Sequence, residues 1–135
     1  MSHGYGGAAR IVRQDENTVV YEYGAYNLNA EKHKNSDRVF DGVIIINKKA
    51  FVEPEIHEKL KRMPSGRKKP IVKRIERDVD YTVLLNAGMI TVENSSFCWR
   101  ILENGVGMMA MKIIIKILRL YQEEGRIPNR VVYDV

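Results

Sequence analysis

GMMAMKIIIKILRLYQEEG, residues 107–125, is the stretch that decides how this chain folds. Its polar positions Lys112, Lys116, Arg119 and Glu123 are spaced 4, 3 and 4 residues apart, so on a helix they form one narrow stripe. Almost every other position is apolar, and a helix of this kind must pack most of its surface against other elements. The stretch therefore predicts a core helix of about five turns, closed by a glycine at each end.

Composition predicts a single domain over residues 1–135, with a glycine-rich, flexible segment at residues 1–7. The chain is 44% hydrophobic and 29% charged, which is typical of a globular protein. Its apolar runs are shorter than the roughly 20 residues of a membrane span, and its first residues lack a signal-peptide pattern. The single cysteine, Cys98, excludes an internal disulfide and a cysteine-rich zinc site. Together these features favour a cytoplasmic protein that does not contact membranes.

Alternating and β-branched apolar runs predict several strands. They lie at residues 8–14, 18–26, 43–46, 71–77, 89–93, 97–102 and 130–135. The run at 43–46 is continuously apolar, which places it in the centre of the sheet. Asp80 is expected to cap a short helix that ends before Gly88. We expect an α+β fold: a mostly antiparallel sheet of about five or six strands packed on the long C-terminal helix.

Residues 53–63, EPEIHEKLKRM, carry the signals of a peripheral amphipathic helix. Pro54 suits the first helical position, and Pro64 stops the helix after one apolar stripe. Acidic residues lie early and basic residues late, which complements the helix dipole. Glu55 and Lys59 form an i,i+4 pair in the favoured order.

Positive charge is concentrated in one segment, residues 59–77. It holds nine of the chain's 22 basic residues and one of its 17 acidic residues, which gives +8. The rest of the chain therefore carries −3, and the total is +5. A basic block on a slightly acidic body indicates a polyanionic or acidic partner.

Three interpretations of this block remain open. It is a solvated face whose strand 71–77 discourages aggregation at a sheet edge, a nucleic-acid surface that neutralises phosphates, or a surface for an acidic protein partner. The absence of aromatic side chains within it speaks against base stacking. Tyrosines outside the block, such as Tyr23 and Tyr26, could supply apolar anchors at a protein interface. The alternative is that these tyrosines are half-buried in the core, which is the more common place for a tyrosine in a strand.

Catalytic and metal-binding patterns are weak in this sequence. The three histidines, His3, His33 and His57, do not form a zinc-ligand pattern, and we expect no metal and no cofactor. A small metal-independent nuclease could use Glu22, His33, His57 and Arg67 as acid, base and charge clamp, but their spacing does not bring them together. We therefore expect a protein that is not an enzyme.

Residues 41–75, DGVIIINKKAFVEPEIHEKLKRMPSGRKKPIVKRI, are followed by SSFCWRILENG and the long helix. In this layout the chain resembles small bacterial proteins encoded beside polymorphic toxins, including the immunity proteins of contact-dependent growth inhibition. The resemblance implies a compact cytoplasmic α+β protein that binds a cognate toxin domain stoichiometrically and covers its active site or target-binding surface. Inhibitors of nucleases are often acidic, whereas this chain has a basic block. The toxin would thus present an acidic surface, such as metal-binding carboxylates, or make its contact elsewhere.

The resulting hypothesis is a non-catalytic, immunity-type inhibitor of a toxin. Nucleic-acid binding through residues 59–77 is the alternative. The residues expected to bind the partner are Lys61, Arg62, Arg67, Lys68, Lys69, Lys73, Arg74, Arg77, Tyr23 and Tyr26.

Overall fold

The computed structural model describes residues 4–62, 64, 66 and 68–134. Along the chain these form β1 (Tyr5–Gln14), β2 (Thr18–Asn27), η1 (Glu31–His33), β3 (Gly42–Asn47), η2 (Lys48–Ala50), β4 (Glu55–Arg62), β5 (Lys68–Ile75), α1 (Tyr81–Asn86), β6 (Ile90–Glu93), α2 (Met108–Glu124) and β7 (Arg130–Asp134). The predicted α+β class is confirmed: a five-stranded antiparallel sheet and a separate two-stranded sheet accompany the long C-terminal helix. In the part of the chain that the structure describes, every helix is too short or too polar to cross a membrane.

The five-stranded sheet has the order β6-β3-β2-β1-β7, and all its neighbouring strands are antiparallel. β1 and β2 form the expected hairpin, in which Asp15 accepts the backbone N–H groups of Asn17 and Thr18, both at 2.8 Å. The prediction that β3 is the central strand is wrong. The last strand, β7, pairs with the free side of β1 and extends the sheet there, so β2 becomes central.

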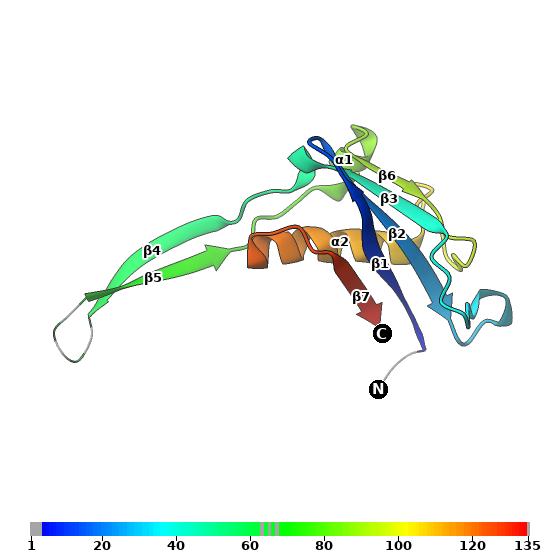
Figure 1. Cartoon of the computed structure of the whole chain (residues 1–135), viewed down its shortest axis with the longest axis horizontal. Helices are drawn as coiled ribbons and strands as arrows, with labels where there is room; N and C mark the ends of the chain where they lie inside the picture. Colours follow the sequence, from blue (N-terminus) through cyan, green and yellow to red (C-terminus); the bar gives the residue numbers. More distant parts are fainter. Residues whose placement is uncertain (1–3, 63, 65, 67, 135) are drawn as a thin grey trace.

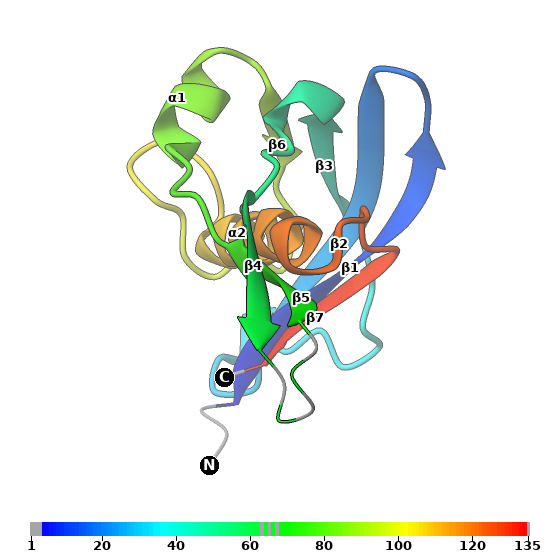
Figure 2. The ribbon, with the colours of Figure 1, turned by 90° about the vertical axis from the view of Figure 1, so that its left-hand side faces the viewer.

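The core lies between one face of this sheet and α2, as predicted (Figures 1 and 2). Buried residues recur along α2 at helical spacing: Met109, Ala110, Ile113, Ile114, Ile117, Leu118 and Gln122. The sheet contributes the fully buried side chains of Tyr21, Tyr23, Ile44 and Ile46. Gly125 ends α2 in the left-handed conformation, with φ 74°, which glycine adopts at little cost.

The N-terminal segment is more ordered than its glycine content predicts. Tyr5, Gly6 and Gly7 belong to β1, which pairs with both β2 and β7, so the expectation of a flexible segment is wrong for these residues. A Cβ atom on Gly7 would lie 2.6 Å from Cγ of Met109. Glycine is needed here because α2 packs closely on the strand. Residues 1–3 of the predicted segment lie outside the described residues.

Residues 53–63 do not form the predicted peripheral helix. Glu55–Arg62 is strand β4, and it pairs along its whole length with β5. The predicted strand at 71–77 is confirmed over residues 71–75, which belong to β5. A strand needs a neighbour to satisfy its backbone N–H and C=O groups. The segment just before the turn supplies that neighbour, and this pairing overrides the helical charge pattern.

Residues 97–102 form a loop instead of the predicted strand, with a single bridge between Ile101 and Gly107. A side-chain hydrogen bond joins the two ends of this loop: Asn94 Oδ1, before the loop, accepts the N–H of Gly107, after it, at 2.7 Å. The loop thus leads directly into the first turn of α2. The neighbouring predictions are confirmed, since Asp80 caps α1 by accepting the Val83 N–H at 3.2 Å.

A second set of hydrogen bonds ties the same loop to the sheet. The Ser95 N–H donates to the Tyr23 hydroxyl at 2.9 Å, and the hydroxyls of Ser95 and Ser96 donate to Asp41. Partial burial alone would raise the pKa of Asp41, but these serine bonds outweigh it and hold that pKa below its usual value.

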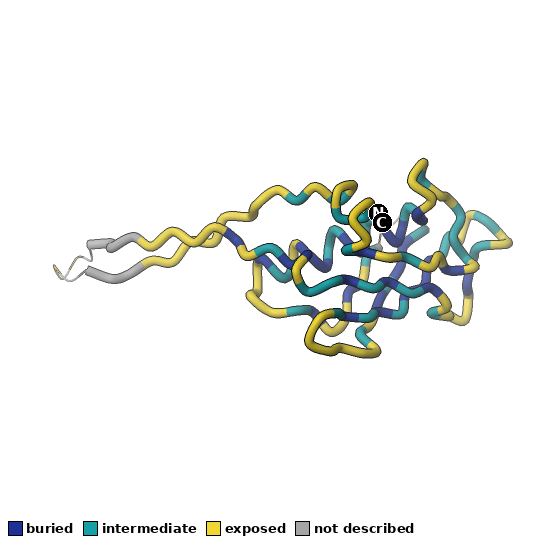
Figure 3. Tube along the Cα trace, turned by 90° about the horizontal axis from the view of Figure 1, so that it is seen from above, coloured by how far each residue is buried: buried dark blue, intermediate teal, exposed yellow. Residues whose placement is uncertain are grey.

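The β4–β5 hairpin extends away from the rest of the molecule (Figures 1 and 3). Its two strands pair with each other and with no other described strand. A two-stranded hairpin alone is marginally stable in water. Its orientation therefore depends on contacts between its ends and the body.

Candidate functional site

The β4–β5 hairpin carries most of the residues expected to bind a partner. In its antiparallel register Lys61 lies opposite Lys69, and Arg62 lies opposite Lys68. Nearer the body, Lys73 lies opposite His57 and Arg74 opposite Ile56, and Arg77 follows the end of β5. Arg67 lies outside the described residues. The sequence thus located a continuous basic segment, although it assigned the first part of that segment, residues 59–63, to a helix.

The last turns of α2 hold both ends of the hairpin. On the β4 side, the Tyr121 hydroxyl donates a hydrogen bond to the carboxylate of Glu53. This bond raises the pKa of Tyr121, because ionising the phenol would remove the donor. On the β5 side, Arg119 pairs with Glu76 at 3.1 Å. Both contacts come from side chains on one end of α2.

Gln122 makes the most enclosed contact at the base of the hairpin. Its side chain is buried, with the residue 2% exposed; its Oε1 accepts the Arg77 N–H at 2.7 Å and its Nε2 donates to the Arg77 C=O at 3.0 Å. Arg74 Nη1 reaches the Gln122 carbonyl at 3.4 Å, where a positive charge suits the C-terminal end of a helix. The helix therefore fixes the direction in which the hairpin leaves the body.

Branched aliphatic side chains are exposed on both faces of the hairpin. Ile56 is 54% exposed and Val72 is 57% exposed, and Ile71 and Ile75 are also exposed. Ile56 and Val72 lie on the same face as diagonal neighbours, because they are opposite Arg74 and Glu58 respectively. Clustered apolar residues with a polar rim mark an interaction surface.

The hairpin is strongly positive as well as partly apolar. Residues 55–75 contain eight basic and two acidic residues, a net charge of +6. Glu55 is engaged by His57 Nε2 at 2.8 Å. Lys73 is exposed and has no ion-pair partner among the side chains that the structure describes. This charge is therefore available to an acidic partner.

The two candidate tyrosines lie away from the hairpin. Tyr23 is fully buried in the core, and burial raises its pKa to about 12. It cannot reach a partner without unfolding, so its assignment to the binding surface is wrong. A strand alternates its side chains between two faces, and position 23 falls on the α2 side. Tyr26 lies on the opposite face, half-buried, with the Arg38 guanidinium 3.8 Å above its ring.

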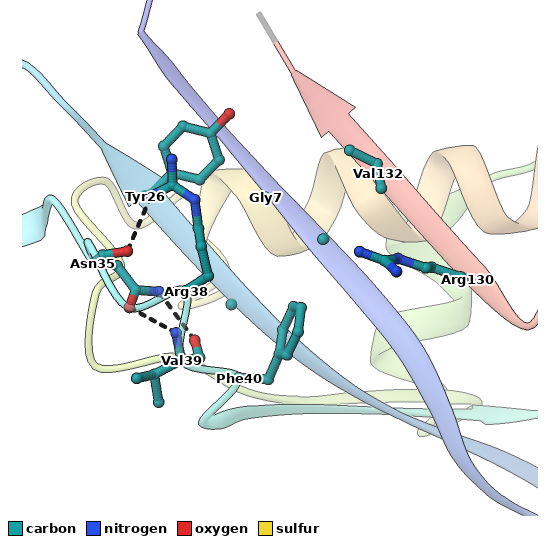
Figure 4. Close-up of a pocket in the computed structure, with 10 residues that line it drawn as sticks. Gly7, Tyr26, Asn35, Arg38, Val39, Phe40, Arg130 and Val132 are labelled. Carbon is teal, nitrogen blue, oxygen red and sulfur yellow. Dashed lines mark hydrogen bonds between the residues drawn. The ribbon is translucent and has the colours of Figure 1, made fainter.

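A cavity of about 360 Å³ lies beside Tyr26 on the outer face of the sheet (Figure 4). Four separate segments line it: β1, β2, β7 and the loop between β2 and β3. The sequence does not reveal this cavity, because no motif links segments so far apart. The available signal was the small residues Ala8 and Gly24 at outward-facing strand positions. Lining side chains include Tyr26, Arg38, Phe40 and Arg130.

The residues of the hypothetical nuclease are not gathered into one site in the described part of the chain. Glu22 pairs with Arg10 on the sheet, His33 lies in η1, and His57 pairs with Glu55 on the hairpin. Arg67 lies outside the described residues. The hairpin is consequently the main candidate site.

No family model, no curated protein sequence and no solved structure matches this chain.

Proposed function

We propose that this chain is a protein-binding protein of the toxin-immunity type, which uses the β4–β5 hairpin to bind an acidic surface of a cognate toxin domain and thereby inhibits it. One observation carries the proposal: a basic hairpin stands clear of the body and exposes branched aliphatic side chains. Burial of such side chains supplies affinity, and the surrounding charges supply orientation.

The attachment of the hairpin to α2 supports this role. Tyr121, Arg119 and Gln122 hold its two ends at the helix, so the hairpin does not have to be ordered entirely upon binding. Ordering flexible segments costs binding free energy, and a fixed base reduces that cost. A protein partner that covers Ile56 and Val72 would also remove exposed apolar area from water.

The positive charge favours a partner surface rich in carboxylates. Complementary charges raise the association rate and exclude partners of like charge. Metal-binding carboxylates in a toxin active site would provide such a surface. Binding at this site would block the toxin without any chemistry on the part of the hairpin.

The test is co-expression with the product of each gene adjacent to this one. The proposal expects that one neighbouring product is toxic, that this chain restores growth, and that the two proteins co-purify in a 1:1 complex. Val72→Asp and Lys73→Glu should weaken the rescue, whereas Lys49→Glu, on an exposed lysine of η2, should not. Failure to rescue cells from any neighbouring product would reject the proposal.

A second candidate function is nucleic-acid binding, favoured by the shape of the hairpin. A two-stranded ribbon fits the major groove of duplex DNA, and the net charge of +6 would release counterions from phosphates. Fluorescence anisotropy with labelled duplex DNA and RNA separates the candidates. Binding that falls about 100-fold or more between about 50 and 200 mM salt, and that is lost in a variant with Arg67, Lys68 and Lys69 changed to Glu, would favour this second function.

A further inference from the structure

The cavity on the outer face of the sheet has a floor made of small residues. Ala8 in β1 lies opposite Gly24 in β2 and opposite Val132 in β7, so this row across three strands carries little side-chain volume. The loop before β3 rests directly on the row, since a Cβ atom on Gly24 would lie 2.2 Å from the Val39 carbonyl oxygen. The loop therefore covers the Gly24 end of the row and forms a wall there, whereas Ala8 and Val132 form the open floor.

The next row of the same face carries an excess of positive charge. Arg10 in β1 lies opposite both Glu22 in β2 and Arg130 in β7. Like charges directly opposite each other destabilise a sheet. Glu22 pairs with Arg10, and Arg10 also lies 4.8 Å from the centre of the Phe40 ring. Among the described side chains Arg130 has no ion-pair partner, and it extends toward the cavity (Figure 4).

The loop between β2 and β3 forms the wall across the cavity from Arg130, and hydrogen bonds of Asn35 hold it in place. Asn35 donates from Nδ2 to the carbonyls of Ala25 at 3.1 Å and Val39 at 3.0 Å, and its Oδ1 accepts the Val39 N–H at 2.8 Å. Asn35 and Arg38 adopt positive φ angles of 47° and 52°, which few residues other than glycine adopt. Such conformations persist where the surroundings determine them, and they cluster at ligand sites. They keep Arg38 stacked on Tyr26 at the rim of the cavity.

We propose that this cavity binds a small organic anion with a planar body. Its charged group meets Arg130, and its planar part lies over Ala8, beside Phe40 and the Arg38–Tyr26 stack. A guanidinium binds carboxylate or phosphate oxygens through paired N–H donors, so both anion types fit the same chemistry. The volume of about 360 Å³ lies within the range of small-molecule sites. This site is independent of the hairpin, and neither proposal requires the other.

Isothermal titration and amide NMR shifts on the full chain can test the site with four probes. These are benzoate as the planar carboxylate, AMP as the planar phosphate, benzamide as the neutral analogue of benzoate, and inorganic phosphate as an anion without a planar body. Benzoate or AMP should bind and shift the amides of Ala8, Gly24 and Val132. Benzamide and inorganic phosphate should each bind about tenfold or more weakly than the better planar anion, since each lacks one of the two recognised features.

Two variants separate charge recognition from shape. Arg130→Gln should weaken the better probe by about tenfold or more. Ala8→Leu should abolish binding by filling the floor without changing any charge. Arg100→Gln, on an exposed arginine of the loop before α2, should leave affinity unchanged. Preference for benzoate identifies a carboxylate ligand and preference for AMP a phosphate ligand. The proposal is overturned if neither binds, if inorganic phosphate binds as well as they do, or if Arg130→Gln binds like the unmodified chain.

Discussion

Removing the Gln122 side chain should loosen the attachment of the hairpin to the body at its β5 end. Gln122→Ala deletes two hydrogen bonds to the backbone of Arg77, at 2.7 and 3.0 Å, each contributing about 1 kcal/mol. It also removes a buried methylene, which contributes about 0.8 kcal/mol. Alanine regains a few tenths of a kcal/mol in helix propensity. The contact between α2 and the β5 end should therefore weaken by about 2.5 kcal/mol.

Native-state hydrogen exchange reports this change where it occurs. A loss of about 2.5 kcal/mol should speed exchange of the Arg77 amide by about 60-fold, because each 1.4 kcal/mol is a factor of ten. Amides of the central strand β2 should change less, since the sheet and α2 keep their packing. An unchanged exchange rate at Arg77 would refute this account of how the hairpin is held.

The isosteric variant Gln122→Glu isolates the hydrogen bond from the packing. When ionised, the new carboxylate keeps an acceptor for the Arg77 N–H but faces the Arg77 carbonyl without a donor. Burial and that carbonyl raise the pKa of the new carboxyl in the folded state. The protonated form, which restores the donor, therefore dominates at low pH, and the variant loses stability relative to the unmodified chain as pH rises from about 4 to 7. A stability difference that is constant over this range would contradict the assigned hydrogen-bond directions.

Three further predictions concern the core, the loop network and the hairpin surface. Gly42→Ala should destabilise the fold by about 3 kcal/mol or more in urea unfolding, because its Cβ would lie 2.2 Å from the buried ring of Tyr23. The control is Gly105→Ala, which should cost only about 1 kcal/mol, because Gly105 has a φ of 82° and open space around it. Asp41→Asn should lower the melting temperature at pH 7 and lose this effect as pH falls through the folded pKa of Asp41. That pKa is lowered, so its stabilisation is present above the unfolded value and disappears in acid; a pH-independent difference would count against it. Val72→Asp should weaken partner binding while leaving the melting temperature within about 2 °C, because the side chain is exposed. A large fall in the melting temperature that accompanied the loss of binding would show instead that Val72 supports the fold.

The sequence predicts the elements that bury apolar residues at a clear period. The 107–125 helix and the β1–β2 hairpin are of this kind, because their residues satisfy local and tertiary demands together. The short helix α1 has no buried residue, and its prediction rests on the Asp80 cap and on Gly88. The failure at residues 53–63 has a specific cause. Apolar residues at 56, 60 and 63 match the helical period, yet residues 56, 58, 60 and 62 also form one face of a strand. Only the pairing with β5 decides between these patterns, and pairing is not visible in a local window.

The candidate sites were predictable to different degrees. The basic segment was visible because charge is a property of composition, whereas its form as a projecting ribbon depended on the misassigned strand. Tyr23 was misplaced because alternation along a strand does not say which face meets the core. The outer cavity depends on cross-strand register: Ala8, Gly24 and Arg130 become neighbours only when β1 lies between β2 and β7.

Because the hairpin is separate from the core, amino-acid substitutions in it can affect partner binding and folding stability independently. Stability resides in the packing of α2 on the large sheet, whereas side chains such as Val72 and Lys73 are exposed and contribute little to it. Substitutions there can alter partner choice at little cost in folding free energy, while substitutions of Gln122 alter the orientation of the whole hairpin. If the hairpin determines specificity, most substitutions at its exposed positions should leave the melting temperature unchanged but reduce growth rescue. Most substitutions at its base should reduce both the melting temperature and growth rescue. A systematic substitution series can test this by measuring both the melting temperature and growth rescue of each variant. If the hairpin has a purely structural role, the two quantities should instead fall together at every position.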